Sequence, residues 1–82
     1  MISFLYQGHT YYANVMIHSR APLRYHISII NSPAGLAKDL ILLLSNVGFE
    51  LSLYSPGLAD KELIDAIASK LPTHYRADAD VA

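Results

Sequence analysis

The feature that most constrains this sequence is the alternation of apolar and mixed positions over residues 2–30. A period of two residues is typical of β-strands that bury one face against a core. Turn-forming residues divide this segment into predicted strands at 2–7, 10–18 and 24–30. The apolar positions on the shared face are Ile2, Phe4, Tyr6, Tyr11, Ala13, Val15, Ile17, Tyr25, Ile27 and Ile29.

The turns between these strands predict how the strands pair. Gly8 indicates a two-residue hairpin turn, of type II′ if glycine is its first residue. Any two-residue turn there places the apolar sets of the first two strands on one face. A five-residue loop at 19–23 then pairs His18 with Arg24. The sequence therefore predicts a three-stranded antiparallel meander.

The segment 33–46 allows two interpretations. Ser32 suits a helix N-cap, Pro33 suits the first helical position, and leucines recur at helical spacing, so a helix is favoured. In the alternative, residues 40–45 form a strand in a hairpin with 49–54, which leaves leucines on both faces of the sheet. Because leucine prefers helices, we expect the helix.

The C-terminal half completes the predicted fold. Residues 49–54 alternate as a strand, and Asp60 can cap a helix at 60–71. We therefore expect an α+β fold in two layers, with a mainly antiparallel sheet and helices 33–46 and 60–71 on one face. The alternative is a five-stranded meander with one C-terminal helix.

The composition adds information about the surface. The chain has 82 residues, of which 52% are hydrophobic and 16% charged. Because about 25% charged residues is usual, some apolar surface is expected to remain outside the core and to mark an interface or a ligand groove. One domain is expected at 1–75, with a frayed tail at 76–82. The apolar residues without a place in the predicted core are Leu5, Tyr12, Met16, Ile30, Leu42 and Tyr54.

The composition also predicts the setting of the protein. The chain has no cysteine, which favours a reducing, cytoplasmic compartment. Its six basic and seven acidic residues give no positive excess for nucleic acid. The longest apolar run, 40–44, is far shorter than the ~20 residues of a membrane helix, and the N-terminus lacks signal-peptide features. We therefore expect neither a nucleic-acid nor a membrane partner.

Candidate binding residues lie on the solvent side of the predicted sheet. His18 and His26 are expected as diagonal neighbours ~7–8 Å apart, within reach of a shared anion or metal. No sequence motif for a metal, a cofactor or a catalytic group accompanies them, so no cofactor and no catalytic residue is predicted. The candidate binding residues are Tyr12, Asn14, Met16, His18, Arg24 and His26.

Three functions are compatible with this pattern. The preferred hypothesis is a non-catalytic module that associates with itself or with a protein partner, because charge is scarce and no catalytic constellation is visible. The first alternative is a small-ligand, anion or metal binder on the outer face of the sheet. The remote alternative is an enzyme whose site is completed at a dimer interface.

Overall fold

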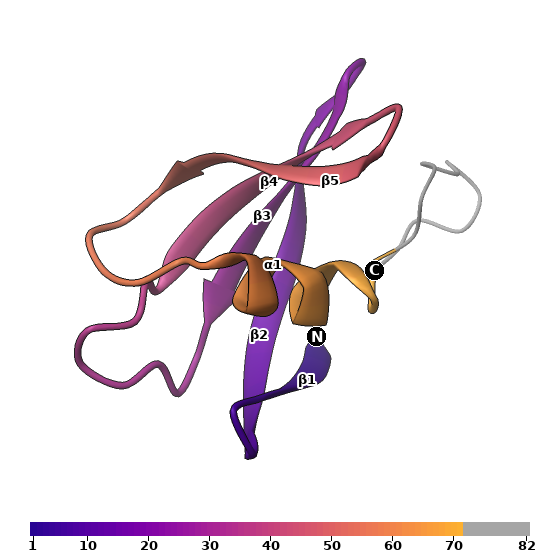
Figure 1. Ribbon diagram of the computed structural model, residues 1–82. Helices are drawn as coiled ribbons and strands as arrows, with labels where there is room; N and C mark the ends of the chain where they lie inside the picture. Colours follow the sequence, from indigo (N-terminus) through magenta and orange to yellow (C-terminus); the bar gives the residue numbers. More distant parts are fainter. Residues whose placement is uncertain (72–82) are drawn as a thin grey trace.

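The computed structural model describes residues 1–71 and contains one antiparallel sheet and one helix (Figure 1). The five strands pair in chain order, each with the next. This is the five-stranded meander with a C-terminal helix that the sequence offered as its alternative. The elements are β1 (Ile2–Tyr6), β2 (His9–Arg20), β3 (Leu23–Ile29), β4 (Asp39–Ser45), β5 (Gly48–Tyr54) and α1 (Lys61–Ala68).

The hairpin of β1 and β2 has the predicted register. Phe4 lies opposite Tyr11 and Ile2 opposite Ala13, so the apolar positions of both strands share one face. The turn differs from the prediction. Gln7 and Gly8 both have positive φ angles, 49° and 79°, which is the signature of a type I′ turn rather than type II′.

The hairpin of β2 and β3 follows the prediction only in part. Ile17 lies opposite Tyr25 as expected, but the register then shifts, and Arg24 pairs with Ser19 rather than with His18. A β-bulge at His18 absorbs the extra residue. As a result β2 runs on to Arg20, and the predicted five-residue loop at 19–23 is reduced to two residues.

The predicted helix at 33–46 is wrong, because β4 occupies residues 39–45. Leu40 and Leu42 are fully buried, whereas Ile41 and Leu43 point to the other face and are half-buried. This strand is apolar on both faces, and from sequence alone such a continuous apolar run resembles a buried helix. Tertiary packing has thus overridden the helix preference of leucine. It also places Leu42 in the core, although the sequence had left it outside.

Helix α1 closes the concave side of the sheet. It contacts the two outermost strands, β1 and β5, so the sheet curls around it (Figure 1). Asp60 caps the helix as predicted, with its carboxylate accepting a hydrogen bond from the Leu63 N–H at 3.0 Å. The helix ends at Ala68, three residues before the predicted end, and a turn at 69–71 follows.

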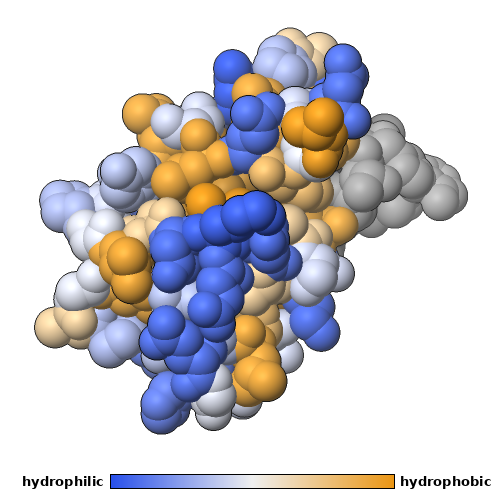
Figure 2. Space-filling view, in the orientation of Figure 1, coloured by the Kyte–Doolittle hydropathy of each residue, from blue (hydrophilic) through white to orange (hydrophobic). Residues whose placement is uncertain are grey.

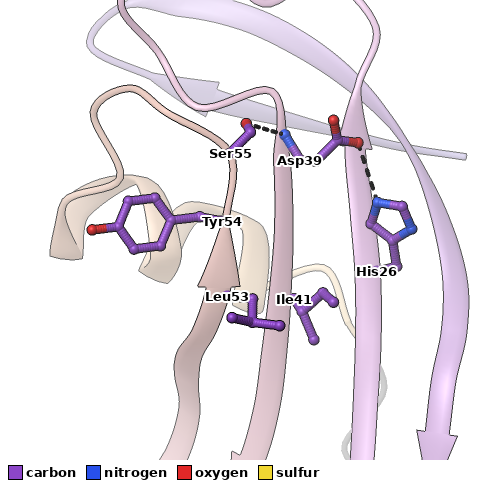
Figure 3. A pocket seen from close by; sticks show the side chains of 6 residues that line it. All are labelled: His26, Asp39, Ile41, Leu53, Tyr54 and Ser55. Atoms are coloured by element: carbon purple, nitrogen blue, oxygen red, sulfur yellow. Dashed lines mark hydrogen bonds and ion pairs between the residues drawn. The ribbon is translucent and has the colours of Figure 1, made fainter.

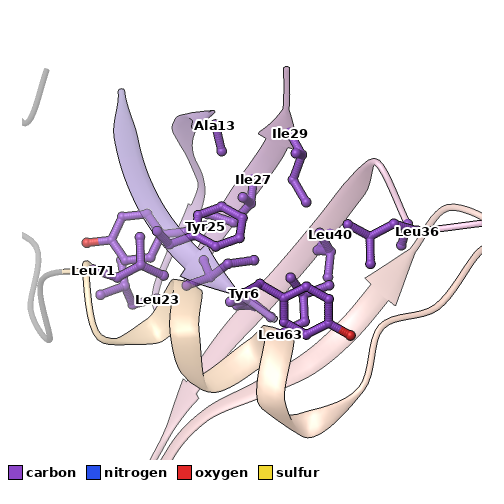
Figure 4. Packing of buried hydrophobic residues seen from close by; sticks show 14 residues of the cluster. Tyr6, Ala13, Leu23, Tyr25, Ile27, Ile29, Leu36, Leu40, Leu63 and Leu71 are labelled. Carbon is purple, nitrogen blue, oxygen red and sulfur yellow. The ribbon is translucent and has the colours of Figure 1, made fainter. Parts of the chain in front are cut away.

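The core lies between this helix and the inner face of the sheet (Figure 4). Leu63 and Ile67 are the fully buried residues of α1. Tyr6 connects the sheet to the start of the helix, since its hydroxyl donates to Asp60 at 3.0 Å. Burial raises the pKa of the Tyr6 phenol, and the hydrogen bond to Asp60 raises it further. The side chains in this core pack around the fully buried strand residues Ala13, Ile27, Ile29, Leu40 and Leu42.

Two further expectations concern the chain as a whole. The tail predicted at 76–82, and the end of the domain at 75, lie outside the described residues. Within residues 1–71, no helix is long and apolar enough to cross a membrane.

Candidate functional site

The side of the sheet that faces away from α1, here called the outer face, carries a continuous cross-strand row. The strand registers place Met16 beside His26, His26 beside Ile41, and Ile41 beside Leu53. These four residues, from β2 to β5, are called the central row below. Met16 is 55% exposed and Leu53 62% exposed, while His26 and Ile41 between them are half-buried. Three of its four members are therefore apolar side chains on the solvent side of a sheet.

A hydrogen-bonded pair of side chains joins the central row to the start of β4. The Nε2 atom of His26 is 3.1 Å from the Oδ1 atom of Asp39 (Figure 3). Beside this pair is a hollow of about 150 Å³. The hollow combines an imidazole and a carboxylate with apolar walls, since it is lined by His26, Asp39, Ile41, Leu53, Tyr54 and Ser55.

Ser55 fixes the position of Asp39 at the start of β4. Its hydroxyl oxygen accepts hydrogen bonds from the backbone N–H groups of Lys38 and Asp39, both at 3.0 Å. The backbone N–H of Ser55 in turn donates to the carbonyl oxygen of Asp39 at 2.9 Å. The start of β4 and the end of β5 are thereby tied together, so the Asp39 carboxylate has a defined place opposite His26.

The six residues predicted from sequence all belong to β2 or β3, and the structure brings some of them together. Met16 and His26 are direct cross-strand neighbours. His18 lies in the bulge, outside the paired register, and Arg24 donates from Nη1 to the Ser19 hydroxyl at 3.2 Å. The expected pairing of His18 with Arg24 is therefore replaced by this contact. The four candidate binding residues on β2 are all exposed: Tyr12, Asn14, Met16 and His18.

Sequence reasoning missed Asp39 and Ile41 as members of this face. Both belong to β4, which the favoured interpretation had assigned to a helix. The register of β3 and β4 places Asp39 opposite Ser28 and Ile41 opposite His26. The signal that could have found them is the alternation of Asp39, Ile41 and Leu43, which becomes readable once residues 39–45 are taken as a strand.

A second apolar region lies on the side of α1. Figure 2 shows a hydrophilic ridge over the helix, with hydrophobic surface between it and the β4–β5 hairpin. A hollow of about 560 Å³ there is walled by Leu44, Val47 and Phe49. The charged groups at its rim are paired with each other, Lys61 Nζ with Asp65 Oδ2 at 2.8 Å. This hollow therefore offers few polar groups that could orient a ligand.

The chemistry available on the outer face is limited. Among residues 1–71, no three His, Asp or Glu side chains gather in a way that could hold a metal ion. An anion beside His26 would meet the Asp39 carboxylate, which disfavours the anion site that the sequence suggested. No family model, no curated protein and no solved structure matches the chain. The site therefore has to be interpreted from its own geometry.

Proposed function

We propose that this domain is a non-catalytic association module that binds a protein surface, most simply a second copy of itself, through its outer face. The observation that supports this most directly is the central row, in which Met16 and Leu53 expose apolar side chains beside the half-buried Ile41. Covering one such side chain contributes about 1–2 kcal/mol to association. Contiguous apolar surface of this kind is typical of interfaces.

The contacts around the hollow favour association over catalysis. A nucleophilic hydroxyl needs a base within hydrogen-bond reach. The serine that lines the hollow is Ser55, and its hydroxyl oxygen already accepts two backbone hydrogen bonds. The His26–Asp39 pair lies across β3 and β4, where it ties the two strands together and offers a polar contact at the centre of an apolar surface.

On the outer face, a small-ligand function has one observation in its favour, the hollow beside the His26–Asp39 pair. Its volume of about 150 Å³ is well below the 300–1,000 Å³ of ordinary ligand pockets. It fits the end of one side chain better than a whole metabolite. We therefore assign the hollow to the association surface. The cysteine-free composition keeps a reducing compartment such as the cytoplasm as the expected setting.

Sedimentation equilibrium over a range of concentrations tests this proposal. We expect the apparent mass of the wild-type chain to rise from monomer towards dimer between about 10 µM and 1 mM, as for a small interface. Leu53→Lys should keep the chain monomeric by placing a charge in the central row. The matched control is Val47→Lys at the tip of the β4–β5 hairpin, because Val47 is 91% exposed and lies away from the central row. A wild-type chain that stays monomeric at about 1 mM would contradict self-association.

A further inference from the structure

The larger of the two hollows described above lies between α1 and the β4–β5 hairpin and is here called the helix-side hollow. Its volume of about 560 Å³ falls within the 300–1,000 Å³ of ordinary ligand pockets, unlike that of the hollow on the outer face. Its hairpin wall consists of Leu44, Val47 and Phe49, and Figure 2 shows hydrophobic surface here beside the hydrophilic ridge of the helix. The helix-side hollow therefore has the size and the apolar surface of a ligand site.

The helix-side hollow is open because its two walls carry side chains of different size. On the helix side it is lined by residues 61, 65, 68 and 69, which share one stripe of α1 and of the turn that follows. Near its end this stripe carries the short side chains of Ala68 and Ser69. The buried residues of the helix, Leu63 and Ile67, belong to the core instead. Space therefore remains in front of the hairpin wall.

The hairpin wall is ordered by contacts within the domain. The centroid of the Phe49 ring lies 6.0 Å from that of Tyr25, which is 2% exposed. At the hairpin tip, the Ser45 hydroxyl accepts a hydrogen bond from the Val47 N–H at 3.3 Å and donates one to the Gly48 carbonyl at 2.9 Å. Because the wall is already ordered, a ligand that binds against it loses less conformational entropy.

The polar side chains that line the helix-side hollow already have partners. Lys61 Nζ is 2.8 Å from Asp65 Oδ2. The Ser69 hydroxyl donates to the carbonyl oxygen of Ala66 at 2.8 Å. A sugar, a nucleotide or an amino acid would cover its own polar groups here without new partners, which is unfavourable. The opposite charges of the ion pair also cancel, so the lining favours an apolar group and selects neither an anion nor a cation.

The shape of the helix-side hollow favours a chain over a ring system. Its helix wall runs from Lys61 to Ser69, a rise of about 12 Å along the helix. An extended chain advances about 1.2 Å per bond, so roughly ten bonds span this length. An apolar cavity of about 150 Å³ holds benzene, so about 560 Å³ has room for a chain of about ten carbons, even where the hollow is open to water.

We propose that the helix-side hollow binds the alkyl chain of a free single-chain amphiphile of about ten carbons, whose head group stays at the rim in water. The chain lies between the hairpin wall and the short side chains of Ala68 and Ser69. This site is separate from the outer face and does not depend on the association proposed there. Because the open hollow covers one side of the chain, each methylene contributes about twofold to the affinity. The dissociation constant is then on the order of 1 mM.

Titration of the ¹⁵N-labelled chain with straight-chain carboxylates, each below its critical micelle concentration, tests this site. We expect the affinity to rise about twofold for each added methylene, or roughly fifteenfold from hexanoate to decanoate. From decanoate to dodecanoate it should rise by less than about twofold, because the hollow is then filled. The amides of Leu44, Val47 and Phe49 should report the binding. Decyltrimethylammonium should bind within about threefold of decanoate, because the head group lies in water.

Two leucine substitutions in α1 provide a variant and its matched control. Ala68→Leu fills the hollow from the helix side and should weaken decanoate binding about tenfold, because the new side chain displaces roughly three methylenes. Glu62→Leu adds the same side chain at an exposed position outside the hollow and should leave the affinity within about twofold of wild type. Should Ala68→Leu lower the melting temperature, Val47→Ser at the 91% exposed tip replaces it, with an expected loss of about threefold. Leu53→Lys on the outer face should bind decanoate as wild type does.

Four results would overturn the proposal. The first is the absence of amide shifts at about 10 mM decanoate. The second is binding that is equally strong in Ala68→Leu, or that keeps rising beyond decanoate, because either would show unspecific contact with apolar surface. The third is a difference of more than about tenfold between the two head groups. The fourth is a shift of the Val47 and Phe49 amides with protein concentration alone, which would show that a second copy covers the hollow.

Discussion

Leu42 and Leu43 are neighbours in β4 with opposite environments. The Leu42 side chain is fully buried on the inner face of the sheet, which α1 covers, whereas the Leu43 side chain is half-buried on the outer face. Replacing Leu42 by alanine removes its side-chain contacts and leaves a cavity, which costs about 3 kcal/mol within a usual range of roughly 2–5. At Leu43 the same replacement changes a surface that water already reaches, so about 1 kcal/mol or less is expected.

Urea unfolding followed by circular dichroism measures both losses. A domain of this length has a free energy of unfolding of about 4–12 kcal/mol, so the Leu42→Ala loss is a large part of the total. Its melting temperature should fall by roughly 12–24 °C, and that of Leu43→Ala by less than about 8 °C. Measurements at low micromolar concentration keep association from contributing to the difference.

The pair of variants also distinguishes the strand from a helix at 33–46. In the helical pattern Leu43 lies on the buried stripe and Leu42 on the opposite side, so the order of the two losses would be reversed. A larger loss for Leu43→Ala than for Leu42→Ala would refute the strand and the register argued above. Equal losses would show that the two faces of β4 do not differ in burial.

Three further predictions concern the rest of the fold. Asp60→Ala should lower the free energy of unfolding by about 1 kcal/mol, because the N-cap of α1 is lost. The control Asp65→Ala removes an exposed ion pair of the same helix and should change this free energy by less than about 0.5 kcal/mol. Equal effects of the two variants in urea titrations would contradict a stabilising role for the N-cap. Stability should fall as the pH rises above 10, because the pKa values of Tyr6 and Tyr25 are raised above 10.0 in the folded state. Above that pH the folded chain holds protons that the unfolded chain has released, so unfolding becomes more favourable. Tyr6→Phe should make the fall in stability with pH less steep, and an unchanged slope would contradict this reasoning. Gly57→Ala should lower the melting temperature by several degrees, because Gly57 has φ +136° and an added Cβ would lie 2.6 Å from the backbone nitrogen of Ala37; an unchanged melting temperature would show that the loop is not held this closely.

The sequence was sufficient where alternation and short turns act together. In β1 and β2, a two-residue turn leaves one register that buries Phe4 and Ala13 on the same face, and the structure has this register. The same alternation placed Tyr25 and Ile27 in the core. The N-cap at Asp60 was also predictable, because a single side chain determines it.

The sequence was insufficient where the fold depends on contacts between distant segments. The run 40–44 is apolar on both faces of β4, with Leu40 and Leu42 in the core and Ile41 and Leu43 on the outer face. Which of these residues face the core depends on pairing with β3 and β5, which the local sequence does not show. The bulge at His18 moves the pairing partner of Arg24 from His18 to Ser19, and no residue in the local sequence marks the position of this bulge. The His26–Asp39 pair needed both the strand and its register, so it could not be predicted once 33–46 was assigned as a helix.

The association surface itself can be mapped residue by residue. The most direct measurement is a series of ¹H–¹⁵N correlation spectra of the wild-type chain from about 20 µM to 1 mM, a range that spans weak dimerisation. We expect concentration-dependent shifts concentrated at the central row of Met16, His26, Ile41 and Leu53 and at the adjacent Asp39, with the amides of α1 unchanged. Spectra that do not change with concentration, or changes confined to α1 and the tip of the β4–β5 hairpin, would contradict association through the outer face.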